Sequence, residues 1–291
     1  MKPSDVLSNR ALNKPKEIAG KAEKTLRRSA NSSASFAFQK MFTHKQPAKE
    51  KLVVALDVDS AERAFELSDQ LRDVVGMFKV GLQLFTAAGP DIVRRIVSRG
   101  GRVFLDLKFH DIPNTVAAAG VEATRLGVSI FNVHASGGSA MMRRTAQIIN
   151  DTAEREGLAK PKLLAVTLLT SLDRNDLNQI GFVEEPGSRV RKLARLAADS
   201  GLDGVVASPQ EIRVVREEVT NPSFLIVTPG IRALPLPEDD QRRMLTAAQA
   251  IAEGADYIVV GRPILDARDP QQAARLIVEQ MEKSLPTNSR R

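Results

Sequence analysis

Short runs of aliphatic and β-branched residues alternate with amphipathic stretches from residue 51 almost to the end of the chain. The apolar runs predict eight strands, over residues 51–58, 77–81, 102–108, 129–135, 162–170, 204–208, 224–230 and 257–263. Between them, stretches such as 61–75, 90–99, 113–127 and 209–219 have the spacing of helices with one apolar face. The order is therefore strand, helix, strand throughout.

Eight strand–helix units within about 235 residues are typical of a (β/α)₈ barrel. The competing architecture is a doubly wound open sheet, which usually carries a G-x-G-x-x-G turn after its first strand, and no such turn is found here. We therefore predict an α/β fold, a (β/α)₈ TIM barrel over residues 51–285. A basic, poorly ordered extension is expected over residues 1–50, and a short tail over residues 286–291.

Charged residues interrupt three of the predicted strands on one face only. In the third strand, Asp106 and Lys108 share a face with Phe104, whereas the opposite face is wholly apolar. Asp57 in the first strand and Lys79 in the second follow the same alternation. Because the wholly apolar face suits contact with helices, we expect the charged face to point into the barrel. Each charge falls near the C-terminal end of its strand, where active sites of this fold are built.

Four charges from three adjacent strands, with Asp111 just beyond them, favour a catalytic site over a structural ion-pair network, because buried ion pairs are weak stabilisers. Flanking carboxylates favour the ammonium form of Lys108, which argues against a Schiff base and for a proton donor. Such an array suits a reaction that develops negative charge on a substrate carbon and then protonates it. Asp106 would oppose a substrate carboxylate and so favour its loss.

Two turns near the C-terminal end of the chain predict a phosphate site. "TPGIR" at 228–232 closes the seventh strand, and "GRP" at 261–263 closes the eighth. Loops after these two strands usually bind phosphate in this fold, with main-chain N–H groups and arginine as donors. The proline-rich stretch 232–241, which ends in Gln241, is interpreted as a mobile flap able to cover the phosphate.

Three other candidates receive simpler interpretations. The stretch 134–141 resembles a phosphate-cradling turn, but Ser136 is interpreted as a helix N-cap. Asp57 and Asp59 stand at alternate positions with no third ligand evident, which argues against a metal pair. His110 belongs to the loop after the third strand and is given no chemical role.

Composition narrows the class of protein. The chain has 291 residues, of which 43% are hydrophobic, and it has no cysteine, which excludes disulfides and thiolate metal sites. Its three histidines are scattered and form no ligand pair. No apolar run approaches the length of a membrane span, and the start lacks the pattern of a secretory signal peptide. We therefore expect a soluble, cytoplasmic protein without a membrane partner.

The net charge of +7 belongs to the N-terminal segment. Residues 1–50 hold eleven basic and four acidic residues, 11 − 4 = +7, and the remainder holds 42 − 11 = 31 basic and 35 − 4 = 31 acidic residues. A solvated extension is the preferred interpretation, and nucleic acid is not an expected partner. A role on nucleic acid or an anionic surface stays open, as does a transit peptide, which Asp5, Glu17 and Glu23 argue against.

The stretch "FLDLKFHDIPNT" resembles the D-x-K-x-x-D signature of the orotidine 5′-monophosphate decarboxylase family. Further matches extend the resemblance over nearly all of residues 51–285, namely "ALDVDSAERA", "FKVG", "NVHASGG", "VTLLTS", "GLDGVVASPQE", "VTPGIR", "DDQRR" and "VVGRPI". The resemblance implies a (β/α)₈ barrel that forms a homodimer. It also implies decarboxylation of orotidine 5′-monophosphate to UMP in pyrimidine synthesis, with no cofactor and no metal.

The resemblance assigns catalytic roles to the charged residues. Lys108 would protonate C6 of the pyrimidine after CO₂ leaves. Lys79, Asp106 and Asp111 would complete a charged tetrad, with Asp111 contributed by the partner subunit. Thr115 would join the site across the same dimer interface.

The resemblance also assigns the substrate contacts. Asp57 would hold the ribose hydroxyls, together with the neighbouring Lys79, and Thr170 would meet the pyrimidine ring. The phosphate would be bound by Arg232, Gln241, Gly261 and Arg262. The basic N-terminal segment departs from the family pattern.

Two rival functions stay open. Sugar-phosphate decarboxylases and synthases resemble the same barrel and share D-x-K-x-x-D, but they bind Mg²⁺ through an acidic residue on the second strand. Lys79 stands on that strand here and would repel the metal. The second rival is a barrel protein whose basic tail binds nucleic acid or a membrane, and a salt-dependent gel shift lost on deletion of residues 1–50 would reveal it.

Overall fold

The predicted barrel is confirmed by the computed structural model, which describes residues 47–231 and 245–284. Contacts divide the chain between Gln46 and Pro47, and the barrel belongs to the second unit. Eight parallel strands pair in sequence order, and β1 also pairs with β8 to close the barrel. The strands are β1 (Leu52–Ala55), β2 (Met77–Gly81), β3 (Val103–Phe109), β4 (Ile130–His134), β5 (Lys162–Val166), β6 (Gly204–Val206), β7 (Leu225–Thr228) and β8 (Tyr257–Val260).

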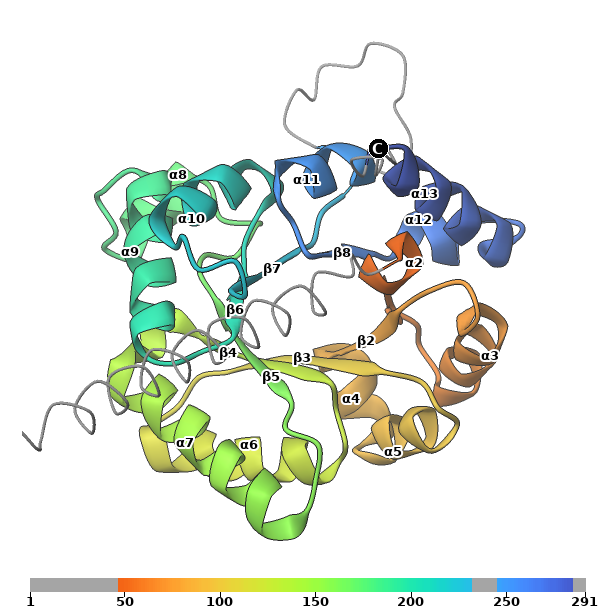
Figure 1. The fold of residues 1–291 in the computed structure, drawn as a ribbon, viewed down its shortest axis with the longest axis horizontal. Coiled ribbons are helices and arrows are strands. Elements are labelled where there is room, and N and C mark those ends of the chain that lie inside the picture. The colour runs from red at the N-terminus through yellow and green to blue at the C-terminus, as the bar shows by residue number, and fades with distance from the viewer. Residues whose placement is uncertain (1–46, 232–244, 285–291) are drawn as a thin grey trace, which may run out of the picture. The chain divides into compact units, whose positions relative to one another are not determined.

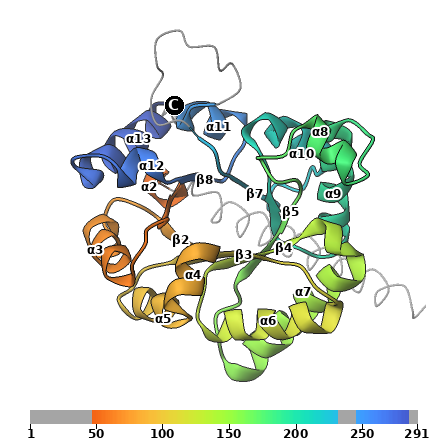
Figure 2. The same cartoon turned by 180° about the vertical axis from the view of Figure 1, so that it is seen from behind.

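Helices surround the strands, as Figures 1 and 2 show from the two ends of the barrel. They are α2 (Ala48–Lys51), α3 (Ala61–Leu71), α4 (Leu82–Ala88), α5 (Asp91–Ser98), α6 (Pro113–Arg125), α7 (Gly138–Glu156), α8 (Arg174–Gln179), α9 (Pro186–Asp199), α10 (Ile212–Glu218), α11 (Ala247–Glu253), α12 (Arg262–Leu265) and α13 (Pro270–Ser284). Short 3₁₀ helices, η1 (Ala135–Gly137) and η2 (Pro209–Glu211), precede α7 and α10. Within the described ranges, no helix is both long enough and apolar enough to cross a membrane.

The alternation predicted for the strands is confirmed by two separate apolar clusters. The inner cluster fills the barrel and contains Val53, Ala55, Met77, Phe104, Ile130, Leu164, Val166, Val206, Val227, Tyr257 and Val259. The neighbouring residues on the same strands pack outward against the helices, for example Val54, Phe78 and Leu105. Burial of both faces explains why these strands are apolar runs, and why a charge on the inward face is exceptional.

N-cap residues mark the starts of some helices, but one predicted N-cap is wrong. Ser60 caps α3 by accepting the Arg63 N–H at 3.2 Å. The interpretation of Ser136 as an N-cap is wrong, because Ser136 lies inside η1 and Gly137 precedes α7 without a side-chain cap. The inserted 3₁₀ turn moves the helix start one residue along the chain. Gly137, which takes the cap position, has no side chain that could accept the free N–H groups of the first turn.

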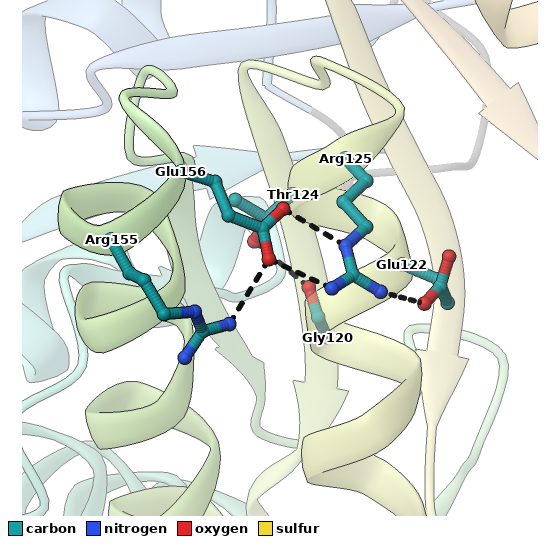
Figure 3. A network of polar contacts seen from close by, with 6 residues as sticks. All are labelled: Gly120, Glu122, Thr124, Arg125, Arg155 and Glu156. Atoms are coloured by element: carbon teal, nitrogen blue, oxygen red, sulfur yellow. Dashed lines mark hydrogen bonds and ion pairs between the residues drawn. The ribbon is translucent and has the colours of Figure 1, made fainter.

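An exposed ion-pair network ties the C-terminal ends of α6 and α7 together (Figure 3). The Arg125 guanidinium donates two hydrogen bonds to Glu156, from Nη2 to Oε1 at 2.7 Å and from Nε to Oε2 at 3.0 Å. Glu122 and Arg155 extend the network on either side, at 2.7 and 3.0 Å. These bonds, chiefly the one from Arg125, hold the pKa of Glu156 at about 2.

Candidate active site

The four charged side chains predicted to meet at the barrel mouth lie in contact with one another. Lys79 Nζ lies 3.1 Å from Asp57 Oδ1 and 3.5 Å from Asp106 Oδ2. Lys108 Nζ lies 2.8 Å from Asp106 Oδ1. Anions and cations therefore alternate along the array, in the order Asp57, Lys79, Asp106, Lys108.

Burial increases toward the middle of the array. The side chains of Lys79 and Asp106 are each 12% exposed, whereas those of Lys108 and Asp57 are 35% and 56% exposed. A charge in such a site is stable only where an opposite charge accompanies it. The alternation supplies that partner for each group, and it places the Lys108 ammonium against a carboxylate in a partly buried environment. Electrostatic effects on a reaction are larger there than in water.

Asn132, on β4, belongs to this array, although the sequence analysis did not single it out. Its Nδ2 donates to Asp106 Oδ1 at 2.7 Å, and its Oδ1 accepts the main-chain N–H of Lys108 at 2.8 Å. The side chain is fully buried. The sequence did carry a signal for it. Asn132 stands two residues after the inward-facing Ile130 and therefore shares its face, just as Asp106 shares the inward face of Phe104.

His110 and His134 form a ring pair beside Lys108, with ring centroids 5.3 Å apart. Burial lowers the pKa of His134, and the charges of His110 and Lys108 lower it further, against the opposing effect of Asp106. The neutral form of His134 is therefore favoured at neutral pH. Neither ring is among the described residues that line the adjoining cavity.

A cavity of about 900 Å³ at the C-terminal ends of the strands contains the array. All four charged residues and the predicted Thr170 line it, and Phe104 contributes an aromatic wall. The remaining lining residues are Ala55, Val206, Pro229, Gly230, Ile231, Val259, Gly261, Arg262, Pro263 and Asp266. A partly apolar cavity of this size with a few convergent polar groups is typical of a small-molecule site.

The two predicted phosphate turns reach the same cavity. Gly261 follows β8, and a Cβ built on it would lie 3.5 Å from Ala55 Cβ and 3.7 Å from Asp57 Oδ2. A side chain at this position would therefore project toward the array, whereas glycine leaves the main chain open to a ligand. Arg262, at the start of α12, lines the cavity, and so does Asp266, at the end of that helix, which was not predicted.

Two predicted site residues, Asp111 and Thr115, do not line this cavity. Asp111 follows β3 and is exposed, and its Oδ1 accepts the main-chain N–H of Ile112 at 2.6 Å. Thr115 lies in the first turn of α6 and is also exposed. Their role across a dimer interface stays a prediction. Arg232 and Gln241 lie outside the described residues.

Potential metal ligands do not gather in the part of the chain that the structure describes, where no three His, Asp or Glu side chains come together as a metal site would require. The carboxylates of the array face lysine ammoniums instead.

Comparisons with known proteins show the family to which the chain belongs. A family model described as "Orotidine 5'-phosphate decarboxylase / HUMPS family" matches residues 50–277. The chain belongs to this family. The resemblance seen in the sequence is thus confirmed, and so is the fold that it implied.

Members of the orotidine 5′-phosphate decarboxylase / HUMPS family are similar to the chain over the whole barrel. Orotidine 5′-phosphate decarboxylase of Moorella thermoacetica is 52% identical over 236 residues, which cover 81% of this chain and 93% of that protein. The protein of the same name from Geobacter sulfurreducens is 50% identical over 237 residues, or 81% of this chain and 98% of that protein. The crystal structure of orotidine 5′-phosphate decarboxylase from Lactobacillus acidophilus has a TM-score of 0.70 and 38% identity, and covers 79% of this chain and 98% of that one.

Proposed function

We infer that the chain decarboxylates orotidine 5′-monophosphate to UMP and CO₂ in pyrimidine biosynthesis. The observation that carries the inference is about 50% identity to orotidine 5′-phosphate decarboxylases over the whole barrel. The alternating charges at the mouth of the barrel support it, because they suit loss of a carboxylate followed by protonation.

We propose that Lys108 is the proton donor. Loss of CO₂ breaks the bond between C6 and the carboxylate carbon, and the electron pair of that bond stays on C6. The Lys108 ammonium then gives a proton to C6, and the resulting amine regains one from water. Asp106, 2.8 Å from Lys108 Nζ, holds the ammonium and opposes a substrate carboxylate placed beside it. The attraction between the ammonium and C6 grows as charge moves onto C6, so it lowers the barrier to reaction.

The rest of the cavity would hold the rest of the nucleotide. Asp57, the most exposed member of the array, would bind the ribose hydroxyls beside Lys79, and Thr170 would meet the pyrimidine ring. Gly261 and Arg262 would bind the phosphate. We extend the phosphate site to Arg232 and Gln241 on the resemblance alone.

We propose further that the chain works as a homodimer in which Asp111 and Thr115 reach the site of the partner subunit. Asp111 is exposed beside Ile112, an isoleucine whose surface is 66% exposed, and Leu82 at the start of α4 is 65% exposed. These apolar side chains follow β3 and β2, at the same end of the barrel as the array. A second copy of the chain placed over this end would cover them and bring its Asp111 toward the array.

Mixing two inactive variants tests the shared site. Lys108→Ala and Asp111→Ala should each lose activity, but a mixed dimer contains one site with an intact Lys108 and an intact Asp111. After unfolding and refolding together in equal amounts, the mixture should regain about a quarter of wild-type activity, since half of the dimers are mixed and each has one good site. No regained activity in a mixture that contains mixed dimers would contradict the shared site.

The nearest alternative is a Mg²⁺-dependent sugar-phosphate enzyme, since the family description also covers that branch. Turnover of orotidine 5′-monophosphate that continues in excess chelator supports the decarboxylase. Turnover restricted to sugar phosphates and lost with the chelator would overturn it. A cytoplasmic location is part of the proposal and rests on the biosynthetic activity.

A further inference from the structure

Lys108 lies on an irregular stretch of β3. Its φ is 52°, and no other non-glycine residue in the described ranges has a positive φ. The pairing of β3 with β4 also shifts register between Leu105 and Phe109. A lysine in this left-handed conformation is disfavoured, because its Cβ crowds the main chain. Contacts around Lys108 must therefore hold it there.

Asn132 supplies one such contact from the neighbouring strand. Its Oδ1 accepts the main-chain N–H of Lys108 at 2.8 Å, at the point where the shifted register takes that N–H out of the regular ladder. Its Nδ2 donates to Asp106 Oδ1 at 2.7 Å, the same oxygen that Lys108 Nζ contacts at 2.8 Å. One side chain therefore fixes both the backbone of Lys108 and the carboxylate that its ammonium contacts.

An amide suits this position for a chemical reason. The two contacts need an acceptor and a donor on one short, planar side chain, and the asparagine amide supplies both without a charge. An aspartate of the same shape would keep the acceptor but place a second carboxylate against Asp106. A leucine would remove both contacts. Because Asn132 is fully buried, neither of its polar groups can turn to solvent instead.

We propose that Asn132 is a positioning residue for decarboxylation, which sets the distance and direction from the Lys108 ammonium to the reacting carbon. The proposal rests on the function proposed above for Lys108. It assigns Asn132 no contact with the substrate. Loss of its amide should therefore slow the chemical step and leave binding of the phosphate and ribose of the substrate unchanged.

Steady-state kinetics on two variants test the proposal. Asn132→Ala removes both contacts, and Asn132→Asp, which has the same shape, removes the donor to Asp106 alone. Each should lower kcat about 100-fold, because a misplacement of about 1 Å costs that much, while KM for orotidine 5′-monophosphate and the inhibition constant of UMP stay within about threefold. Retained kcat in both variants would overturn the proposal. Retained kcat in Asn132→Asp alone would overturn the role of the contact with Asp106.

A matched control separates positioning from loss of stability. Thr145 is also fully buried, and its Oγ1 donates to Met141 O at 2.8 Å within α7. Thr145→Val should lower the melting temperature and leave kcat unchanged. If it lowers kcat as much as the Asn132 variants do, the effect of Asn132 is structural and the proposal fails. Lys108→Ala tests the role on which this proposal rests, because retained activity in that variant would contradict Lys108 as the proton donor.

Discussion

The substitution Asp106→Asn tests whether the carboxylate balances the two lysines that flank it. The asparagine has the same shape and can still form hydrogen bonds, but it leaves Lys79 and Lys108 with Asp57 as the remaining anion of the array. The four-group array then changes from neutral to a net charge of +1. Both the stability of the fold and the rate of the reaction should decrease.

The distances set the size of the effect. Asp106 oxygens lie 2.8 and 3.5 Å from the two ammonium nitrogens, which corresponds to gross attractions of about 5 to 6 kcal/mol each at an effective dielectric constant of about 20. Desolvation offsets most of this, and water reaches Lys108, whose side chain is 35% exposed. Removal of one partner from a buried ion pair costs about 3 to 5 kcal/mol in free energy of unfolding. We expect the lower end, about 3 kcal/mol, because Lys79 keeps Asp57.

Thermal unfolding and kinetics measure the two effects. A loss of about 3 kcal/mol lowers the melting temperature of a domain of this size by about 6 to 12 °C. The rate constant kcat should decrease by about 100- to 1000-fold, the usual cost of one preorganised electrostatic contact. An unchanged melting temperature together with an unchanged kcat would show that the Asp106 carboxylate does not balance the charges of Lys79 and Lys108.

Asp203→Asn is the control for this prediction. Asp203 is 17% exposed, pairs with Lys162 at 2.8 Å and accepts the Leu163 N–H at 2.9 Å. It lies where β5 and β6 begin, at the end of the barrel opposite the array. Asp203→Asn should destabilise the fold by less, because Lys162 is 55% exposed and the asparagine can still accept the Leu163 N–H, and it should leave kcat unchanged.

Two further predictions concern the phosphate and the surface network. Arg262→Ala should raise KM for orotidine 5′-monophosphate about 10- to 100-fold with little change in melting temperature, and an unchanged kcat/KM would contradict the phosphate role. Hydrogen bonds from Arg125 lower the pKa of Glu156 from 4.5 to about 2, so its stabilising effect is present above pH 4.5 and is lost as the pH falls toward 2. Glu156→Gln should therefore melt below the wild type at neutral pH, and the difference should narrow in acid; a difference independent of pH would contradict the network's contribution.

Alternation along the strands was enough to predict the centre of the site. Asp57, Lys79, Asp106 and Lys108 could be found because a charge on the inward face of a buried strand is costly and therefore conspicuous. Asn132 obeys the same alternation, but it is uncharged and was not singled out. Its place on the inward face of β4 was visible in the sequence, but only charged residues on that face were treated as conspicuous.

Other features depend on contacts that a single sequence does not express. The left-handed backbone of Lys108 and the shifted register of β3 have no local signature, since lysine favours neither. The 3₁₀ turn over Ala135–Gly137 takes Ser136 out of the cap position, and the residues of this turn did not predict it. Asp266 was not predicted as a cavity residue. It lines the cavity because the short helix α12, of four residues, ends there and turns the chain toward the cavity.

The proposed decarboxylation is tested most directly by the ultraviolet absorbance of orotidine 5′-monophosphate incubated with the purified protein after treatment with a chelator. We expect loss of the orotate chromophore with the wild type, and no loss with a folded Lys108→Ala variant. A wild-type protein that is folded and dimeric but leaves the chromophore intact would contradict decarboxylation of orotidine 5′-monophosphate by this chain. A Lys108→Ala variant that decarboxylates at nearly the wild-type rate would contradict the assignment of the proton donor.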